Sequence, residues 1–281
     1  VPHFIMPLVQ VIVLAILQGI TEFLPISSSA HLALTPWLFG WADQGLEFDI
    51  ALHFGTLFSV LIYFFRDWLR ILANGVGMGD MPVLGQDPAL DRNPKMLWYL
   101  IAATIPAGVA GLLFKDTVES TLRSPYVMGG MLIAVGLLMW LTEKWAKHER
   151  TIGEMNLKDC LFIGCAQALA LIPGTSRSGI TMTAGLARNL DRSTAARFSF
   201  LLSTPIVAAA ALKGLYDLRK HGALTPEMIP SLAIGIVVTA ITGCFVISVL
   251  LKFLRTNSVV PFVVYRIAFG LFVIGLAFTR G

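Results

Sequence analysis

Two short polar stretches interrupt an otherwise apolar chain, and both contain residue types that handle phosphate groups. The first, QGITEFLPISSSAH (residues 18–31), combines a glutamate, three consecutive serines and a histidine. The second, IPGTSRSGIT (172–181), combines an arginine with glycines and serines. Hydroxyls, backbone N–H groups at a glycine-containing turn and a guanidinium all bind phosphate oxygens. The two stretches therefore indicate a site that binds an anion.

Glu22 follows Gln18 by four residues, so a helix would place both side chains on one face. A carboxylate and an amide oxygen are a suitable start for a Mg²⁺ or Ca²⁺ site, which would complete its ligands with water and a substrate phosphate. The alternative is a structural ion pair between Glu22 and Arg177. Both interpretations predict that Glu22 faces the other polar residues.

Ser28 precedes His31 by three residues. In a helical turn this spacing would let the imidazole accept the proton of the hydroxyl, which is how a serine becomes a nucleophile. Such pairs are common in proteins, and Glu22 and Arg177 nearby make the catalytic interpretation the stronger one. An activated water attacking in place of Ser28 remains the alternative.

Other ionisable residues lie inside apolar stretches, where exposure to lipid would cost about 2.5–3.5 kcal/mol each. Asp49 stands one turn before His53, so we expect it to orient a histidine that packs or accepts hydrogen bonds. Arg266 has a corresponding role as a brace between helices. These residues are predicted to lie behind the site and to hold the residues that line it in place.

Composition decides the class of protein that must position these residues. Of the 281 residues, 56% are hydrophobic and 14% charged, and the mean hydropathy is +0.75. Soluble domains have about 25% charged residues. A hydrocarbon core of about 30 Å needs roughly 17 to 25 helical residues, which predicts an all-α polytopic membrane protein with spans at about 48–65, 97–114, 125–142, 198–214, 231–251 and 260–278.

Two further apolar stretches, 4–24 and 159–172, run into the polar stretches instead of ending in charged flanks. Broken helices at membrane depth are tolerated where protein or water satisfies their backbone groups, and their N-termini favour anions. We therefore expect two re-entrant helix–loop–helix segments. Both breaks would line one cavity.

The two halves of the chain resemble each other. At an offset of 149, Gln18, Ser27 and Ser29 fall on Gln167, Ser176 and Ser178. Each half, about 1–145 and 158–281, would contain one re-entrant segment and three spans, and an odd number of crossings inverts the second half. Basic residues divide thirteen to six between the two sides of this arrangement, which favours the richer side as cytoplasmic. The prediction is two inverted-topology repeats in one membrane domain, 1–281.

The formal net charge of +4 is spread over several loops. It matches the ordinary excess of basic residues in cytoplasmic loops, so no nucleic-acid partner is predicted. Cys160, Cys165 and Cys244 have no metal-site spacing and are expected to pack as small apolar side chains.

The two polar stretches, together with FDIALHFGT, FSFLLSTP and PFVVYR, resemble the undecaprenyl-diphosphate phosphatase family, also called the bacitracin-resistance proteins. The resemblance extends over nearly the whole chain. The family has Glu or Gln, three residues and then Glu, and this chain has the amide variant, Gln18, at the first position. Glu22 would then supply the charge.

The resemblance implies hydrolysis of undecaprenyl diphosphate to the monophosphate and phosphate, dependent on a divalent cation. It also implies a bacterial inner-membrane location, a site that opens to the periplasm or outside, and recycling of the carrier lipid for peptidoglycan synthesis. On this basis Glu22, Ser28, His31 and Arg177 are the expected catalytic residues, Glu22 and Gln18 the metal ligands, and Ser27, Gly174, Ser176, Ser178 and Thr181 the substrate-binding residues. A homodimer is an alternative to a monomer.

The same features are compatible with two other classes of membrane protein. Inverted repeats with broken helices are also typical of transporters, so a polyprenyl-phosphate carrier or flippase would use the same cavity. A transporter needs no nucleophile or proton acceptor, which favours the phosphatase. An intramembrane serine protease built on Ser28 and His31 would leave Arg177 and the second serine-rich stretch without a role.

Overall fold

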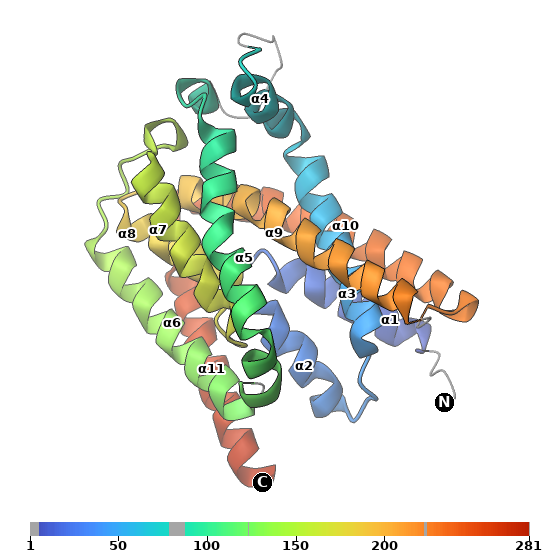
Figure 1. Cartoon of the computed structure of the whole chain (residues 1–281). Helices are drawn as coiled ribbons and strands as arrows, with labels where there is room; N and C mark the ends of the chain where they lie inside the picture. Colours follow the sequence, from blue (N-terminus) through green and yellow to red (C-terminus); the bar gives the residue numbers. More distant parts are fainter. Residues whose placement is uncertain (1–5, 79–87, 123, 222–223, 281) are drawn as a thin grey trace.

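The structure, a computed structural model, describes residues 6–78, 88–122, 124–221 and 224–280 (Figure 1). The α-helices in chain order are α1 (Leu8–Thr21), α2 (Ser28–Phe39), α3 (Gly45–Tyr63), α4 (Phe65–Gly75), α5 (Met96–Thr121), α6 (Pro125–Trp145), α7 (Leu157–Ala168), α8 (Arg177–Ala187), α9 (Arg192–Lys220), α10 (Ile229–Leu254) and α11 (Val260–Arg280). Short 3-10 turns are η1 (Pro88–Arg92), η2 (Ile152–Glu154), η3 (Leu169–Leu171) and η4 (Pro226–Met228).

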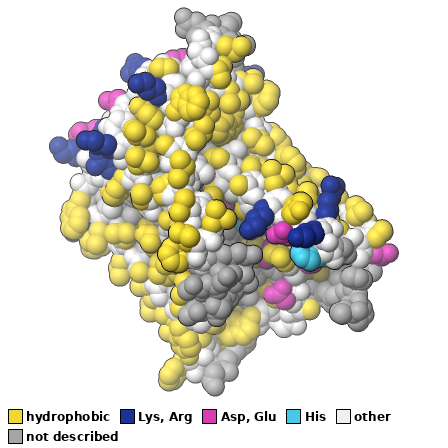
Figure 2. Space-filling model, viewed as in Figure 1, with side chains coloured by type: hydrophobic (Ala, Val, Ile, Leu, Met, Phe, Trp, Pro, Cys, Tyr) yellow, Lys and Arg dark blue, Asp and Glu magenta, His cyan; other side chains and the backbone are white. Residues whose placement is uncertain are grey.

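Six of the described segments are helical, long and apolar enough to cross a membrane, namely Gly45–Tyr63, Met96–Phe114, Pro125–Trp145, Arg192–Lys220, Pro226–Leu254 and Val260–Thr279. Each corresponds to one of the six predicted spans, so the prediction of a polytopic helical membrane protein is confirmed. α5 is largely uncovered, with Trp98, Ile105 and Leu112 exposed. Figure 2 shows the outer face of the long helices dominated by hydrophobic side chains, with charged side chains gathered at its upper left and right.

A separate helix follows the first span. α3 ends at Tyr63, the backbone turns at Phe64 (φ −98°, ψ 20°), and Phe65–Gly75 form α4. The cause is tertiary. Arg197 of α9 donates to the carboxylate of Asp67, whose side chain is fully buried. Since a buried charge is costly without a partner, this ion pair fixes α4 against the start of α9.

Both segments that were expected to re-enter the membrane consist of two helices separated by an irregular break. α1 ends at Thr21 and α2 begins at Ser28, and α7 with η3 ends at Leu171 before α8 begins at Arg177. A proline lies in each break, Pro25 or Pro173, where it cannot donate a helical hydrogen bond. The breaks therefore leave several backbone groups free for other partners.

The local geometry of the two breaks repeats at the predicted offset of 149. Ser27 and Ser176 have positive φ angles of 78° and 68°. The Oγ of each accepts from the backbone N–H three residues later, that of Ala30 or Gly179, and so caps the helix that follows. Each also contacts the serine two residues on, with an Oγ–Oγ distance of 3.2 Å in both cases.

The first helix of each broken segment packs against a helix from the other half of the chain, α1 against α10 and α7 against α5. Small residues make this close approach feasible. A Cβ added at Gly19 would lie 2.7 Å from the Cβ of Thr242 on α10, and one at Gly164 would collide with the backbone carbonyl of Ala103 on α5. α6 and α11 run side by side along the edge opposite α3 and α10 (Figure 1).

Candidate active site

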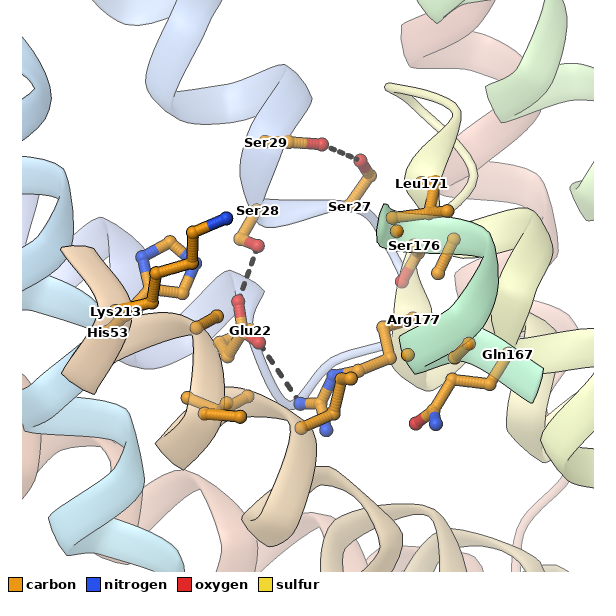
Figure 3. A pocket seen from close by; sticks show the side chains of 18 of the residues that line it. Glu22, Ser27, Ser28, Ser29, His53, Gln167, Leu171, Ser176, Arg177 and Lys213 are labelled. Atoms are coloured by element: carbon orange, nitrogen blue, oxygen red, sulfur yellow. Dashed lines mark hydrogen bonds and ion pairs between the residues drawn. The ribbon is translucent and has the colours of Figure 1, made fainter. Parts of the chain in front are cut away.

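A cavity of about 570 Å³ lies where the two breaks face α3, α5 and α9. Its polar wall comes from the breaks and includes Glu22, Ser28 and Arg177, as Figure 3 shows. Its opposite wall consists largely of apolar residues, many of them small, such as Gly108 on α5 and Val207 on α9. The cavity thus combines groups for an anion with a surface for a hydrocarbon chain.

Glu22 is the centre of the polar wall and is only 8% exposed. Its Oε2 accepts hydrogen bonds from Ser28 Oγ at 2.6 Å and from Gln18 Nε2 at 3.2 Å, and its Oε1 accepts from Arg177 Nη2 at 3.0 Å. The structure therefore brings the guanidinium of Arg177, 155 residues later in the sequence, to the carboxylate that Ser28 also contacts. The predicted ion pair with Arg177 is present at Oε1, and Gln18 lies beside Oε2, where the predicted metal site would be.

Two side chains join the breaks to each other. Ser178 Oγ lies 3.1 Å from the carbonyl oxygens of Glu22 and of Leu24. Arg266, which is fully buried, donates to the carbonyls of Pro25 at 2.9 Å, Gly174 at 3.1 Å and Thr175 at 2.9 Å. Free carbonyls of broken helices are thereby satisfied, as burial in a membrane requires. Arg266 also donates to α6, so it braces helices as the sequence indicated.

The predicted hydrogen bond between Ser28 and His31 is wrong, because both ring nitrogens of His31 have other partners and Ser28 donates to Glu22. The Nδ1 of His31 donates to the carbonyl of Ser27 at 2.7 Å, so the neutral ring accepts at Nε2, where the Tyr265 hydroxyl lies 2.7 Å away. The ring also stacks on Phe269, with centroids 4.5 Å apart. The helical spacing was correct, but partners on α11 turn the imidazole away from the cavity.

His53 lines the cavity beside Glu22, and Asp49, one turn earlier, orients it through its backbone carbonyl. His53 Nδ1 donates to the backbone carbonyl of Asp49 at 2.7 Å, and the Asp49 carboxylate accepts from Gln44 Nε2 at 2.9 Å. The donor role of Nδ1 leaves Nε2 of the neutral ring as an acceptor. His53 is therefore a polar group of the cavity itself.

The predicted phosphate cradle is only partly on the cavity surface. Ser27 and Ser176 line the cavity. Ser178 and Thr181 are buried behind it, where Thr181 Oγ1 contacts the carbonyl of Arg177 at 2.7 Å and Ser199 Oγ at 2.6 Å. Gly174, with φ 89°, passes so close to Met128 that only a glycine fits. These three residues shape the break that presents Arg177.

Three polar residues that line the cavity, Ser29, Gln167 and Lys213, were not among the predicted site residues. Gln167 is 3% exposed, and both polar atoms of its side chain lack hydrogen-bond partners among the described residues, as do Nε and Nη1 of Arg177. Its correspondence to Gln18 at the offset of 149 was the signal that could have found it. Lys213 was a cation inside an apolar stretch, which is itself a functional signal.

A divalent cation fits the chemistry of the donors in one respect. Gln18 Oε1 is buried beside Glu22 with no hydrogen-bond partner within the described residues, and amide and carboxylate oxygens suit Mg²⁺ or Ca²⁺. The described residues contain no group of three or more His, Cys, Asp or Glu side chains that could enclose an ion. Such an ion would need water and substrate oxygens for its remaining ligands.

Fold and cavity together define a multi-pass membrane protein with a cavity that has one polar wall. Comparison with known families is decisive: the family model "Bacitracin resistance protein BacA" matches residues 11–272. The chain belongs to this family.

Curated relatives agree. The chain is 47% identical over 272 residues to the undecaprenyl-diphosphatase of Gemmatimonas aurantiaca, covering 96% of this chain and 98% of the relative. It is 44% identical over 275 residues to that of Moorella thermoacetica, covering 98% and 100%. It is also 47% identical over 275 residues to undecaprenyl-diphosphatase 2 of Stutzerimonas stutzeri, covering 94% and 96%.

Proposed function

We propose that this protein hydrolyses undecaprenyl diphosphate to undecaprenyl phosphate and inorganic phosphate. The names of its relatives give the substrate. The observation that carries the proposal is the contact of Ser28 and Arg177 with the same carboxylate, Glu22, inside a cavity with an apolar wall. The activity would recycle the carrier lipid for peptidoglycan synthesis and confer bacitracin resistance.

Phosphoryl transfer depends mainly on positioning and on neutralising charge, and this cavity offers both. Ser28 Oγ attacks the terminal phosphorus and forms a P–O bond, while its proton passes to Glu22 Oε2, 2.6 Å away. The bond between that phosphorus and the bridging oxygen breaks, and undecaprenyl phosphate leaves. Water then hydrolyses the phosphoserine to release phosphate. Arg177 and the serines of the breaks bind the phosphoryl oxygens.

In this mechanism Glu22 accepts the proton of the Ser28 hydroxyl, a role that the sequence had suggested for His31. His31 instead donates from Nδ1 to the carbonyl of Ser27, and so helps to fix the backbone of the first break. Direct attack by water is the second route to the same products, with Ser28 then a binding group. When bound, a divalent cation held by Glu22 and Gln18 would neutralise phosphate charge.

The membrane arrangement forms part of the same proposal. Matching break geometry at an offset of 149, and packing of α1 on α10 and α7 on α5, support two inverted-topology repeats of about 1–145 and 158–281 in one domain. The excess of basic residues supports a cytoplasmic side at α4, η2 and the start of α9. The cavity would then open to the periplasm or outside from the bacterial inner membrane. A homodimer is a further candidate arrangement.

The test is phosphate release from undecaprenyl or farnesyl diphosphate by purified protein in detergent, with Mg²⁺ or Ca²⁺ and with EDTA. Detergent removes the two sides that transport requires, so release identifies an enzyme. Glu22→Ala and Arg177→Ala should abolish release while remaining folded by size-exclusion chromatography. A folded wild type that releases nothing with either cation would favour the alternative, a polyprenyl-phosphate carrier or flippase. Activity that survives EDTA would contradict the requirement for a cation.

A further inference from the structure

Lys213 extends from α9 into the cavity that contains Glu22 and Ser28 (Figure 3). Ile206 and Ala210 line the same cavity, and spacings of four and three residues place all three side chains on one face of the helix. This face is apolar up to Ala210 and then presents an ammonium group. The lysine therefore lies at one end of the apolar wall.

Close packing of α9 on α3 holds this lysine near the reacting groups. A Cβ added at Gly214 would lie 2.6 Å from Cδ1 of Ile50, so the two helices approach too closely there for a larger residue. Ile50 is one turn before His53 on α3, and His53 lines the cavity. Lys213 and His53 consequently form one side of the cavity, and Gln167 lies on the other side, beyond Arg177 (Figure 3).

The charges in the cavity do not balance those of a diphosphate. Glu22 and Arg177 are 3.0 Å apart and largely neutralise each other. Lys213 is exposed in the cavity, and within the parts of the chain that the structure describes no hydrogen bond or ion pair engages it. A lysine is a flexible point charge well suited to phosphate. A diphosphate carries several negative charges, which the Glu22–Arg177 pair alone cannot compensate.

We propose that Lys213 binds the terminal phosphate of the diphosphate substrate and so helps to select a diphosphate over a monophosphate. This inference rests on the proposed function, and it makes Lys213 a substrate-binding residue, without a part in bond making. The ammonium group holds the terminal phosphate, which hydrolysis removes from the lipid. Undecaprenyl phosphate keeps only the lipid-linked phosphate, so the product loses this contact and dissociates more readily.

A lysine near the end of a membrane helix also has an ordinary explanation, since it can extend its charge toward the interface. Lys220 provides the matched control, because it lies on the same helix, is exposed and does not line the cavity. The experiment compares wild type, Lys213→Met, Lys213→Arg and Lys220→Met in detergent. Steady-state phosphate release from farnesyl diphosphate gives KM and kcat, and pyrophosphate-induced shifts in thermal unfolding measure anion binding without turnover.

For Lys213→Met we expect KM to rise on the order of tenfold, with kcat changed far less, and the pyrophosphate shift to be lost. Lys213→Arg should restore most of both, and Lys220→Met should match wild type. Equal KM values and pyrophosphate shifts for Lys213→Met and wild type would overturn the inference, as would equal losses in Lys213→Met and Lys220→Met. A wild type without phosphatase activity but with a Lys213-dependent pyrophosphate shift would contradict the proposed function alone and support this binding site.

Discussion

The Ser28 hydroxyl donates a 2.6 Å hydrogen bond to Glu22, and the other carboxylate oxygen is held by Arg177. The groups that serve in the proposed mechanism as nucleophile, proton acceptor and phosphate-binding group therefore contact one another directly. Such an arrangement avoids reorganisation during the reaction, which is the main advantage of a preformed polar site. Its cost is a buried ion pair, which the joined backbones of the two breaks keep in place.

Replacement of Ser28 distinguishes the two routes of hydrolysis. If its oxygen attacks phosphorus, Ser28→Ala should lower phosphate release by at least about a hundredfold, because the covalent route is removed. Acid-quenched wild type should then carry a phosphoserine at residue 28 by mass spectrometry. Thr35→Ala on the same helix is the control, since Thr35 Oγ1 donates to the carbonyl of His31 and this residue does not line the cavity. Residual activity above about a tenth, without phosphoserine, would establish direct attack by water.

The Glu22–Arg177 pair should show strong coupling in a double-mutant cycle of stability. Removing either partner leaves the other charge buried and unpaired, which costs about 3–5 kcal/mol. We therefore expect Glu22→Gln and Arg177→Met each to destabilise the protein, and the double variant to lose less than the sum. Unfolding in denaturant measures all three. Additive losses would show that the two charges are solvated independently. The control is Asp91→Asn, at an ion pair with Arg70 in which the aspartate is half-exposed, and it should lower the free energy of unfolding by less than about 1 kcal/mol.

The sequence predicted Glu22, Ser28 and Arg177 together because charged groups in apolar segments need partners. It failed for His31, whose direction depends on Tyr265, 234 residues later, and spacing along one helix carries no such information. α4 was not predicted from the sequence, and its position depends on Arg197, 130 residues after Asp67, which supplies the partner for that carboxylate. Lys213 belongs to the cavity only through the packing of Gly214 on Ile50.

Arg266 should be more important for stability than any other residue behind the breaks. Its guanidinium satisfies carbonyls of both breaks and of α6, and a lysine ammonium cannot reproduce that planar set of donors. Arg266→Lys should therefore destabilise the protein by about 3 kcal/mol or more. Chemical unfolding in detergent is the measurement, with the exposed Arg255→Lys as control. A loss below about 1 kcal/mol would mean that water replaces the guanidinium.

Gly108 should tolerate a larger side chain in the fold but not in catalysis. A Cβ at this position meets no atom within 4 Å, and Gly108 lines the apolar wall of the cavity. Gly108→Leu should consequently leave the unfolding midpoint near that of wild type. It should reduce hydrolysis of undecaprenyl diphosphate at least about tenfold, because the leucine would occupy the surface that binds the lipid chain. Gly130→Leu is the control, because its Cβ is also unobstructed but lies outside the cavity. Equal activity of both variants would place the lipid chain elsewhere.

The acid limit of stability should depend on Asp159, at the start of α7 and outside the long spans. Burial by itself raises the pKa of this carboxyl, but hydrogen bonds from Arg150 and Arg188 outweigh burial and hold the folded pKa below its ordinary 3.8. The ionised group therefore stabilises the fold at pH values above 3.8, and this contribution disappears as the pH falls through the folded pKa.

Asp159→Asn should accordingly unfold more easily than wild type at pH 7, by about 3 kcal/mol, because two arginines lose their acceptor. The difference should stay constant down to about pH 5 and shrink below 3.8, where wild type also becomes protonated. Thermal unfolding of both proteins across this pH range is the measurement, and the exposed Glu149→Gln should follow wild type throughout. A difference that persists undiminished in strong acid would show that the carboxylate charge is not what joins α7 to Arg150 and Arg188.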